Sequence, residues 1–203
     1  MFSFDIDKYL NRIGIDMAAS DLHVTGESLC LLQKAHLYCV PYENFDIIDG
    51  NPLDHTTEAL YNKIVERERG GIFTELNGLF GDLLRAIGFG VNEYLARILY
   101  TEDGSPLKQH RVLEVQARDG NYICDVGIGT ESPRIPLKKE EGLVQNDGFA
   151  ITSSKTSRFW VGSSGSARKC PNGKSFIRLR MRYSFQLIFC SLRFILKIPQ
   201  DLR

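Results

Sequence analysis

The spacing of apolar residues in this 203-residue chain changes near position 90, and that change restricts its fold more than any other feature. In the first ninety residues, apolar side chains recur every three or four positions, as they do on one face of a helix. The clearest stretch has Leu76, Leu79 and Leu83 on one face and Gly88 at its end, which predicts a long amphipathic helix. Shorter helices are predicted before it, one of them capped by Thr25.

Beyond position 90 the sequence alternates between apolar and polar residues, which is typical of strands. Residues 91–100 and 109–117 follow this pattern, and Asp119-Gly120 predicts a hairpin turn into a third strand. Helices followed by antiparallel strands are the order of an α+β protein, not of an alternating α/β one. We therefore predict an α+β fold with an N-terminal helical bundle followed by an antiparallel β-sheet or partial barrel.

Charge divides the chain into unequal parts. Residues 1–150 hold 14 Lys and Arg against 24 Asp and Glu, a net of −10, whereas residues 151–203 hold 11 against one, a net of +10. From Ile151 the sequence is rich in Ser, Gly and basic residues, which predicts loop. We expect three parts: a helical domain over 1–90, an antiparallel β domain over 91–150, and a basic, atypical C-terminal segment.

Composition argues against several classes of protein. No apolar run reaches the roughly 18–20 residues of a membrane-spanning helix, and the acidic residues near the N-terminus are unlike a secretory signal. We therefore expect a cytoplasmic protein with no membrane partner. Five cysteines without a CxxC pair favour neither a disulfide framework nor a zinc site, so no metal is expected. The basic tail lacks a stacking motif, and nucleic-acid binding through it is not expected either.

His110 and Asp125 are the candidates for chemistry. His110 opens a strand after a polar loop, so its ring can face a cleft. His36 lies on an apolar helix face, where a hydrogen-bonded core histidine is expected, and His23 and His55 fall in loops. Asp125 is a carboxylate in the apolar strand "YICDVGIG", and a buried carboxylate needs a partner. It is either a structural residue or the group that orients His110 and stabilises its charged form.

The spacing does not by itself bring His110 and Asp125 together. A two-residue turn at Asp119-Gly120 pairs Glu114 with Asp125 and leaves Asp125 four positions from His110 along the shared face. That is about 13 Å at ~3.3 Å per residue. A His–Asp pair therefore requires a bulge, a bend or a shifted register.

A glycine turn precedes the long helix in "RGGIFTELN", and a helix start can activate a nucleophile by stabilising its anion. Together with "VPYENFDI", "HRVLEV" and "DVGIG", this segment resembles the arylamine N-acetyltransferase family, whose hallmark is Arg-Gly-Gly-x-Cys-x-Glu-x-Asn. The resemblance covers roughly residues 3–145. It implies a cysteine-protease-like fold and an acetyl transfer from acetyl-CoA, as co-substrate, to an arylamine, arylhydroxylamine or hydrazine. It also implies that His110 and Asp125 support the catalytic cysteine.

Phe73 occupies the position of that cysteine, and a phenyl ring cannot be acylated. Thr74 does not replace it, because one residue along a helix turns the side chain by about 100° and an unactivated hydroxyl is a poor nucleophile. Cys124 is expected to point to the strand face opposite Asp125. A papain-like peptidase would lack its thiol in the same way.

Residues after Gln145 depart from the family, so the C-terminal lid is expected to be truncated or disrupted, and the charge switch suggests a shifted reading frame. We interpret the chain as a family member with impaired or absent acetyl transfer. The alternative is a non-enzymatic module that holds a small aromatic ligand in a cleft around Phe73.

Overall fold

The computed structural model describes residues 2–96, 110–129 and 132–139 in full. Further along the chain it describes the backbone of five short strands: β5 (Gly142–Asn146), β6 (Phe149–Ser153), β7 (Phe159–Ser163), β8 (Ala167–Lys169) and β9 (Ser175–Ile177). The end of the strand predicted over 91–100 and most of the basic segment lie outside the described residues.

Helices make up the first half of the chain, as the apolar spacing predicts. They are α1 (Ile6–Arg12), η1 (Ala19–Asp21), α2 (Gly26–Cys39), α3 (Phe45–Ile48), α4 (Thr57–Tyr61), the π-helical turn η2 (Asn62–Glu66) and α5 (Phe73–Ile87). Thr25 caps α2, since its side chain accepts a hydrogen bond from the Ser28 N–H at 3.3 Å. Gly88 ends α5 with a left-handed φ of 112°, which glycine adopts without strain. No helix in the described part of the chain is both long and apolar enough to cross a bilayer.

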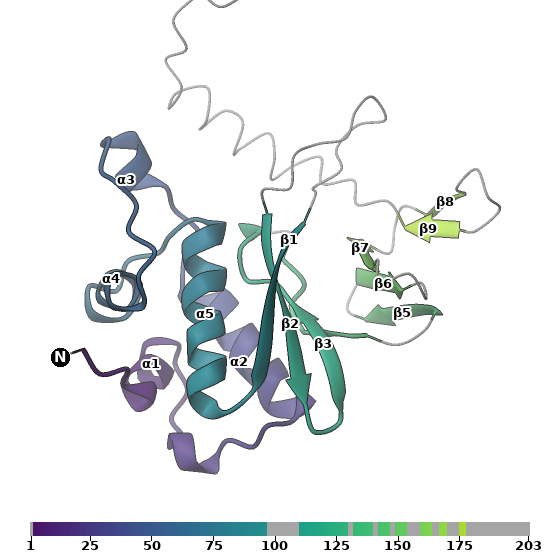
Figure 1. Ribbon diagram of the computed structural model, residues 1–203, viewed down its shortest axis with the longest axis horizontal. Coiled ribbons are helices and arrows are strands. Elements are labelled where there is room, and N and C mark those ends of the chain that lie inside the picture. The colour runs from purple at the N-terminus through teal and green to yellow at the C-terminus, as the bar shows by residue number, and fades with distance from the viewer. Residues whose placement is uncertain are drawn as a thin grey trace, which may run out of the picture.

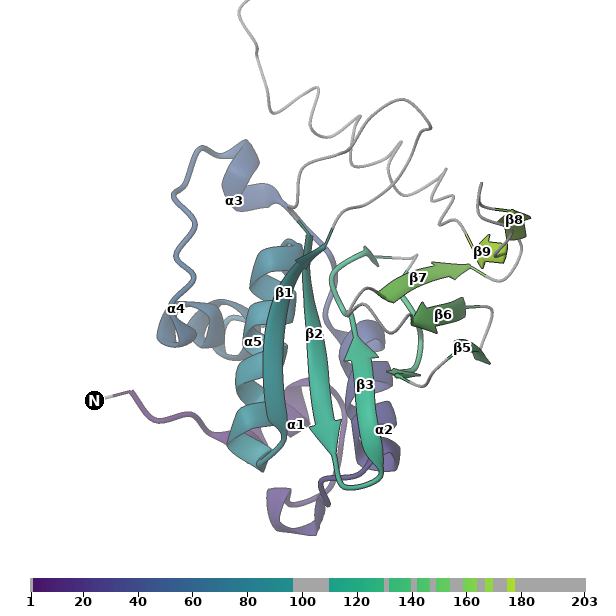
Figure 2. The ribbon, with the colours of Figure 1, turned by 45° about the vertical axis from the view of Figure 1, so that its right-hand side comes forward.

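The strands form an antiparallel sheet in the order β1 (Gly90–Ala96), β2 (His110–Ala117), β3 (Gly120–Cys124) and β4 (Leu137–Lys138). Helix α5 runs alongside β1 and β2, and α2 lies against β3 (Figures 1 and 2). The helices and the antiparallel sheet confirm the α+β prediction.

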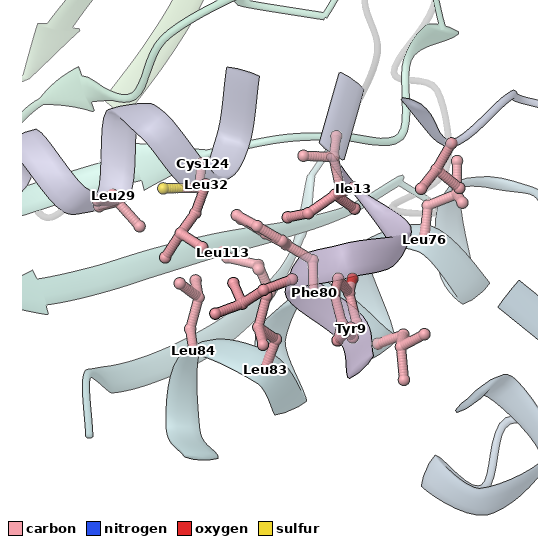
Figure 3. Packing of buried hydrophobic residues seen from close by; sticks show 14 of the residues in the cluster. Tyr9, Ile13, Leu29, Leu32, Leu76, Phe80, Leu83, Leu84, Leu113 and Cys124 are labelled. Atoms are coloured by element: carbon pink, nitrogen blue, oxygen red, sulfur yellow. The ribbon is translucent and has the colours of Figure 1, made fainter. Parts of the chain in front are cut away.

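The core lies between this sheet and the helices, and α5 contributes most to it. Leu76, Phe80, Leu83 and Leu84 of α5 are fully buried and face side chains of α1, α2 and β2 (Figure 3). Burying each such side chain stabilises the fold by about 1.5–3 kcal/mol. Cys124 is completely buried in the same cluster, so it packs as an apolar residue on the face predicted for it.

His36 is a core histidine, as predicted. Its Nδ1 lies 2.9 Å from the hydroxyl of Tyr9, and its ring contacts Phe80 at a centroid distance of 5.3 Å. Burial, with a further contribution from Arg12, lowers the pKa of His36 to about 3. The imidazole is therefore neutral at physiological pH.

The predicted register of the β2–β3 hairpin is wrong by two residues. The turn consists of Arg118 and Asp119, so that Ala117 pairs with Gly120. The reason is tertiary: the Asp119 carboxylate accepts hydrogen bonds from the Gly26 N–H at 2.8 Å and from the Tyr122 hydroxyl at 2.8 Å. These bonds fix Asp119 inside the turn and anchor the hairpin to the start of α2.

The prediction of loop from Ile151 onward is also wrong where the structure describes the backbone. Strand β6 extends to Ser153 and pairs with β7, and β8 pairs with β9. Strand β7 contains Phe159, Trp160 and Val161, residue types that favour strands and that outweigh the Ser- and Gly-rich composition around them. The division of the chain at positions 90 and 150 stays a prediction.

Candidate active site

The glycine turn before α5 exists because two backbones meet there. The Gly71 N–H donates to the Pro41 carbonyl at 3.3 Å, and the Glu43 N–H donates to the Gly71 carbonyl at 3.1 Å. A Cβ added to Gly70 would lie 1.9 Å from the Pro41 oxygen, so no larger residue fits. The turn thus joins the "VPYENF" segment to the start of α5.

A network of charged side chains lies beneath this turn. The Lys63 ammonium lies 2.7 Å from Asp46 and 2.8 Å from Glu75, and the Arg69 guanidinium lies 2.7 Å from Asp46 and 2.9 Å from Glu43. Hydrogen bonds from Lys63 and then Arg69 lower the pKa of Asp46 to about 2. Because each carboxylate has a cationic partner, the network holds the chain around the turn in one conformation.

Glu75 also caps the helix. Its Oε2 accepts the Ile72 N–H at 3.0 Å, and Lys63 holds both carboxylate oxygens of Glu75 at 2.8 and 3.0 Å. A glutamate in the first turn of a helix is favoured by the helix dipole, but no local pattern indicates the buried lysine that fixes this side chain.

The structure brings His110 and Asp125 together. The His110 Nε2 lies 2.5 Å from Asp125 Oδ2, and both side chains are buried. Continuing the observed β2–β3 register places Asp125 opposite Val112, only two positions from His110. Burial opposes the charged imidazole, but the charge and hydrogen bond of Asp125 outweigh it and raise the pKa of His110 above its ordinary value.

Asn77 fixes the Asp125 carboxylate from helix α5. Its Nδ2 donates to Asp125 Oδ1 at 2.9 Å and to the Arg111 carbonyl at 2.8 Å, and its Oδ1 accepts the Val126 N–H at 2.9 Å. The Gly127 N–H donates to the same Asp125 oxygen at 2.9 Å. From the sequence alone, an asparagine early in a helix is expected only to hydrogen-bond locally. The position of Asn77 four residues after Phe73, on the same helix face, is the signal that could have found it.

Phe73 is the first residue of α5, and its half-buried ring lies against the imidazole. The ring centroids of Phe73 and His110 are 5.4 Å apart, with an angle of 42° between the planes. A Cβ added to Gly127 would lie 2.8 Å from the Phe73 Cα, so Gly127 packs directly behind the helix start. The Tyr42 hydroxyl accepts a hydrogen bond from the Phe73 N–H, and burial, with the nearby Glu75, raises the pKa of Tyr42 to about 12.

Thr74 has a partner that the sequence did not indicate. Its Oγ1 lies 2.9 Å from Nε2 of His55, in the loop before α4. The sequence predicts an unactivated hydroxyl at Thr74 and places His55 in a loop. The two residues are 19 positions apart, and no local pattern links them.

An imidazole held by a carboxylate, beside the first residue of a helix on an α+β scaffold, is an arrangement found in enzymes that transfer acyl groups through a side-chain nucleophile. The family model described as N-acetyltransferase matches residues 26–169. The chain belongs to the arylamine N-acetyltransferase family, as the resemblance in its sequence implies.

Curated relatives support this assignment over part of their length. The arylamine N-acetyltransferase of Mycolicibacterium smegmatis is 38% identical over 150 residues, which are 70% of this chain and 53% of that enzyme. The arylamine N-acetyltransferase / N-hydroxyarylamine O-acetyltransferase of Salmonella typhimurium is 37% identical over 122 residues, which are 60% of this chain and 43% of that enzyme. The chain thus spans about half the length of the curated relatives it matches.

Solved structures of arylamine N-acetyltransferases support the same family assignment. A crystal structure of an M. smegmatis variant, with Gln in place of one Cys, has a TM-score of 0.72 and 32% identity, covering 79% of this chain and 60% of that one. The Mycobacterium marinum enzyme in complex with CoA has a TM-score of 0.70 and 32% identity, covering 78% of this chain and 60% of that one.

Proposed function

We propose that this chain is an arylamine N-acetyltransferase homologue in which the supporting His110–Asp125 pair is in place but the nucleophile position holds Phe73. His110 and Asp125 are the proposed catalytic residues, acetyl-CoA is the proposed co-substrate, and an arylamine or hydrazine is the proposed acceptor. Phe73 blocks the covalent step, so acetyl transfer through position 73 is absent. The CoA complex of the M. marinum relative and the arylamine specificity in the relatives' names support the two substrates.

The observation that carries this proposal is the contact between the Phe73 and His110 rings at 5.4 Å. It shows that the side chain at position 73 projects toward the imidazole that Asp125 holds. A cysteine there would have its proton acceptor close by, whereas a phenyl ring offers no atom that can form an acyl bond.

With a cysteine at position 73, the steps would follow from this geometry. His110 takes the thiol proton, and the sulfur attacks the thioester carbonyl of acetyl-CoA. The bond to the CoA sulfur breaks, and CoA leaves with the proton that His110 returns. The amine then attacks the acetyl-enzyme, His110 takes the amine proton, and the cysteine sulfur leaves. Asp125 stabilises the imidazolium in both halves of the cycle.

The experiment compares the wild type with the Phe73→Cys variant. Each protein is incubated with acetyl-CoA alone, for intact-mass analysis, and with acetyl-CoA and aniline, for detection of acetanilide. We expect no acetanilide from the wild type, and an acetyl adduct on Cys at position 73 of the variant. Phe73→Cys combined with His110→Gln is the matched control, and it should lose the adduct. Acetanilide formation by the wild type that depends on His110 would refute the proposed block.

The cysteines fit a cytoplasmic location, which we also propose. Cys39 and Cys124 are free thiols, and thiols persist in the reducing compartment where acetyl-CoA-dependent enzymes work.

A further inference from the structure

Helix α5 carries a buried carboxylate in the turn where the proposed reaction needs a stabilised anion. Glu75 is the third residue of α5 and is only 2% exposed. Its Oε2 accepts the Ile72 N–H at 3.0 Å, so the carboxylate lies at the N-terminal end of the helix. The positive end of a helix dipole stabilises a thiolate, but a fixed negative charge beside it opposes that effect. The charge of Glu75 therefore needs to be offset.

Lys63 supplies the opposite charge from a separate element. Its Nζ lies 2.8 and 3.0 Å from the two carboxylate oxygens of Glu75, and both side chains are buried. Lys63 belongs to η2, and single π-helical turns such as this one are rare and occur frequently at functional sites. Because the lysine holds both oxygens, Glu75 keeps its bond to the Ile72 N–H while a cation in direct contact offsets its charge.

The other cation of this network does not duplicate the role of Lys63. Arg69 contacts Glu43 at 2.9 Å and Asp46 at 2.7 Å, whereas its ion pairs do not include Glu75. Lys63 also contacts Asp46, at 2.7 Å. Removal of the lysine would therefore leave Asp46 with Arg69 as its partner, and Glu75 as the carboxylate without a contacting cation among the described residues.

The charge of Glu75 acts at the start of the helix. Burial, followed by the charge of Glu75, raises the pKa of Tyr42 to about 12. The hydroxyl of Tyr42 accepts the Phe73 N–H, so it lies beside residue 73. A negative charge that acts on this hydroxyl also acts on an anion at residue 73.

We propose that Lys63 is a positioning residue for the proposed acyl transfer: by offsetting the charge of Glu75, it lets the start of α5 stabilise an anion at position 73. This inference rests on the proposed function, because such an anion forms only when residue 73 is a cysteine. It gives η2 an electrostatic role in addition to holding the chain around the glycine turn.

Other titratable and charged groups face the start of α5, and the test leaves them unchanged. They are Tyr42 before α3, His55 before α4, His110 and Arg111 on β2, and Asp125 after β3. Within the described part of the chain, the hydrogen bonds and ion pairs of Lys63 include none of these groups. A change at Lys63 therefore reaches residue 73 through Glu75.

The test titrates the thiol of the full-length Phe73→Cys variant. Alkylation by iodoacetamide is followed across the pH range, and mass spectrometry quantifies the peptide that contains residue 73, so the five native cysteines do not interfere. A nearby charge shifts a pKa by about 1–3 units. We expect the lower end, because Lys63 and Glu75 line a cavity of about 230 Å³ in which water weakens their field. Adding Lys63→Met should thus raise the thiol pKa by about one unit and slow alkylation about tenfold below that pKa.

A double-mutant cycle separates the charge of Lys63 from its structural role. Glu75→Gln alone should lower the thiol pKa, because the carboxylate is removed while Lys63 keeps its contact with Asp46. Combining Lys63→Met with Glu75→Gln should bring the thiol pKa back to within a few tenths of a unit of the Phe73→Cys parent. A purely structural role would not produce that recovery. Lys8→Met is the matched control, since Lys8 pairs with Glu66 of the same turn at the surface, and it should leave the thiol pKa unchanged.

Two results would overturn the proposal. One is an unchanged thiol pKa in Lys63→Met when circular dichroism shows that the variant is folded. The other is an unchanged thiol pKa in Glu75→Gln, which tests the proposal even if Lys63→Met does not fold. Alkylation requires neither acetyl-CoA nor an amine, so a Phe73→Cys chain that shows the expected shifts but gains no acetyl group counts against the proposed function and not against the role of Lys63.

Discussion

Replacing Asn77 with Ala should destabilise the protein far more than the small size of the asparagine side chain suggests. Asn77 is completely buried and makes three hydrogen bonds, one to the Asp125 carboxylate and two to the backbone of Arg111 and Val126. Alanine makes none of them. The variant removes a donor from the Arg111 carbonyl and leaves the buried Val126 N–H without its acceptor, at the place where α5 meets the sheet.

The size of the effect follows from these three bonds. A hydrogen bond to a charged group contributes about 1.5–3 kcal/mol, and each neutral one about 0.5–1.5 kcal/mol. Their sum for Asn77→Ala lies between about 2.5 and 6 kcal/mol of unfolding free energy. Since whole domains are stable by about 5–15 kcal/mol, the variant should keep its fold with a much lower denaturation midpoint.

Urea unfolding followed by circular dichroism measures this difference. Asn92→Ala, an exposed asparagine on β1, is the matched control and should change the unfolding free energy by less than about 0.5 kcal/mol. A loss below about 1 kcal/mol for Asn77→Ala would refute the reasoning. NMR titration of His110 gives a second readout. Its pKa should fall in Asn77→Ala, because Asp125 loses the donor that orients it.

Three further predictions follow from burial and close contact. Asp125→Asn should lower the pKa of His110 below its ordinary value, since burial then acts alone; NMR titration measures this, and an unchanged pKa would contradict it. In the wild type the raised pKa of His110 adds stability below pH 6.5 that is lost as pH rises through the folded-state pKa. In Asp125→Asn the lowered pKa should reverse the sign of this dependence in urea unfolding, so that stability rises with pH. His36, with a pKa of about 3 in the folded protein, should make stability fall as pH drops from about 6.5 toward 3; His36→Phe should flatten that decline, and an equally steep decline would argue against it. Gly70→Ala should cost several kcal/mol, because its Cβ would overlap the Pro41 carbonyl at 1.9 Å; a melting temperature within a degree of wild type would be inconsistent with this contact.

Local patterns predict the elements of this fold well, because spacing and capping act within a few residues. Helix α5, its end at Gly88 and the Thr25 cap all follow from neighbouring residues. The hairpin register does not, because Asp119 is fixed in the turn by hydrogen bonds to Gly26 and Tyr122. A carboxylate that bonds to a helix 93 residues away gives no signal in the sequence around it.

The residues of the candidate active site, like the elements of the fold, can be predicted from the sequence only where the signal is local. His110 and Asp125 stand out in the sequence because a histidine at a strand start and a carboxylate in an apolar strand are unusual. Their contact depends on the register, which tertiary bonds decide. Asn77 bonds to residues 34 to 49 positions away, and Thr74 meets a histidine from a loop. Such partners become visible only once the chain is folded.

Main-chain contacts hold residue 73 in place. Gly127 packs against the Phe73 Cα, and the Phe73 N–H donates to the hydroxyl of Tyr42. None of these contacts depends on which side chain residue 73 carries, so the surrounding backbone can hold either a phenylalanine or a cysteine there. Phenylalanine and cysteine codons differ by a single base. A single nucleotide change in the codon for residue 73 would therefore place a cysteine beside His110 in the same backbone frame.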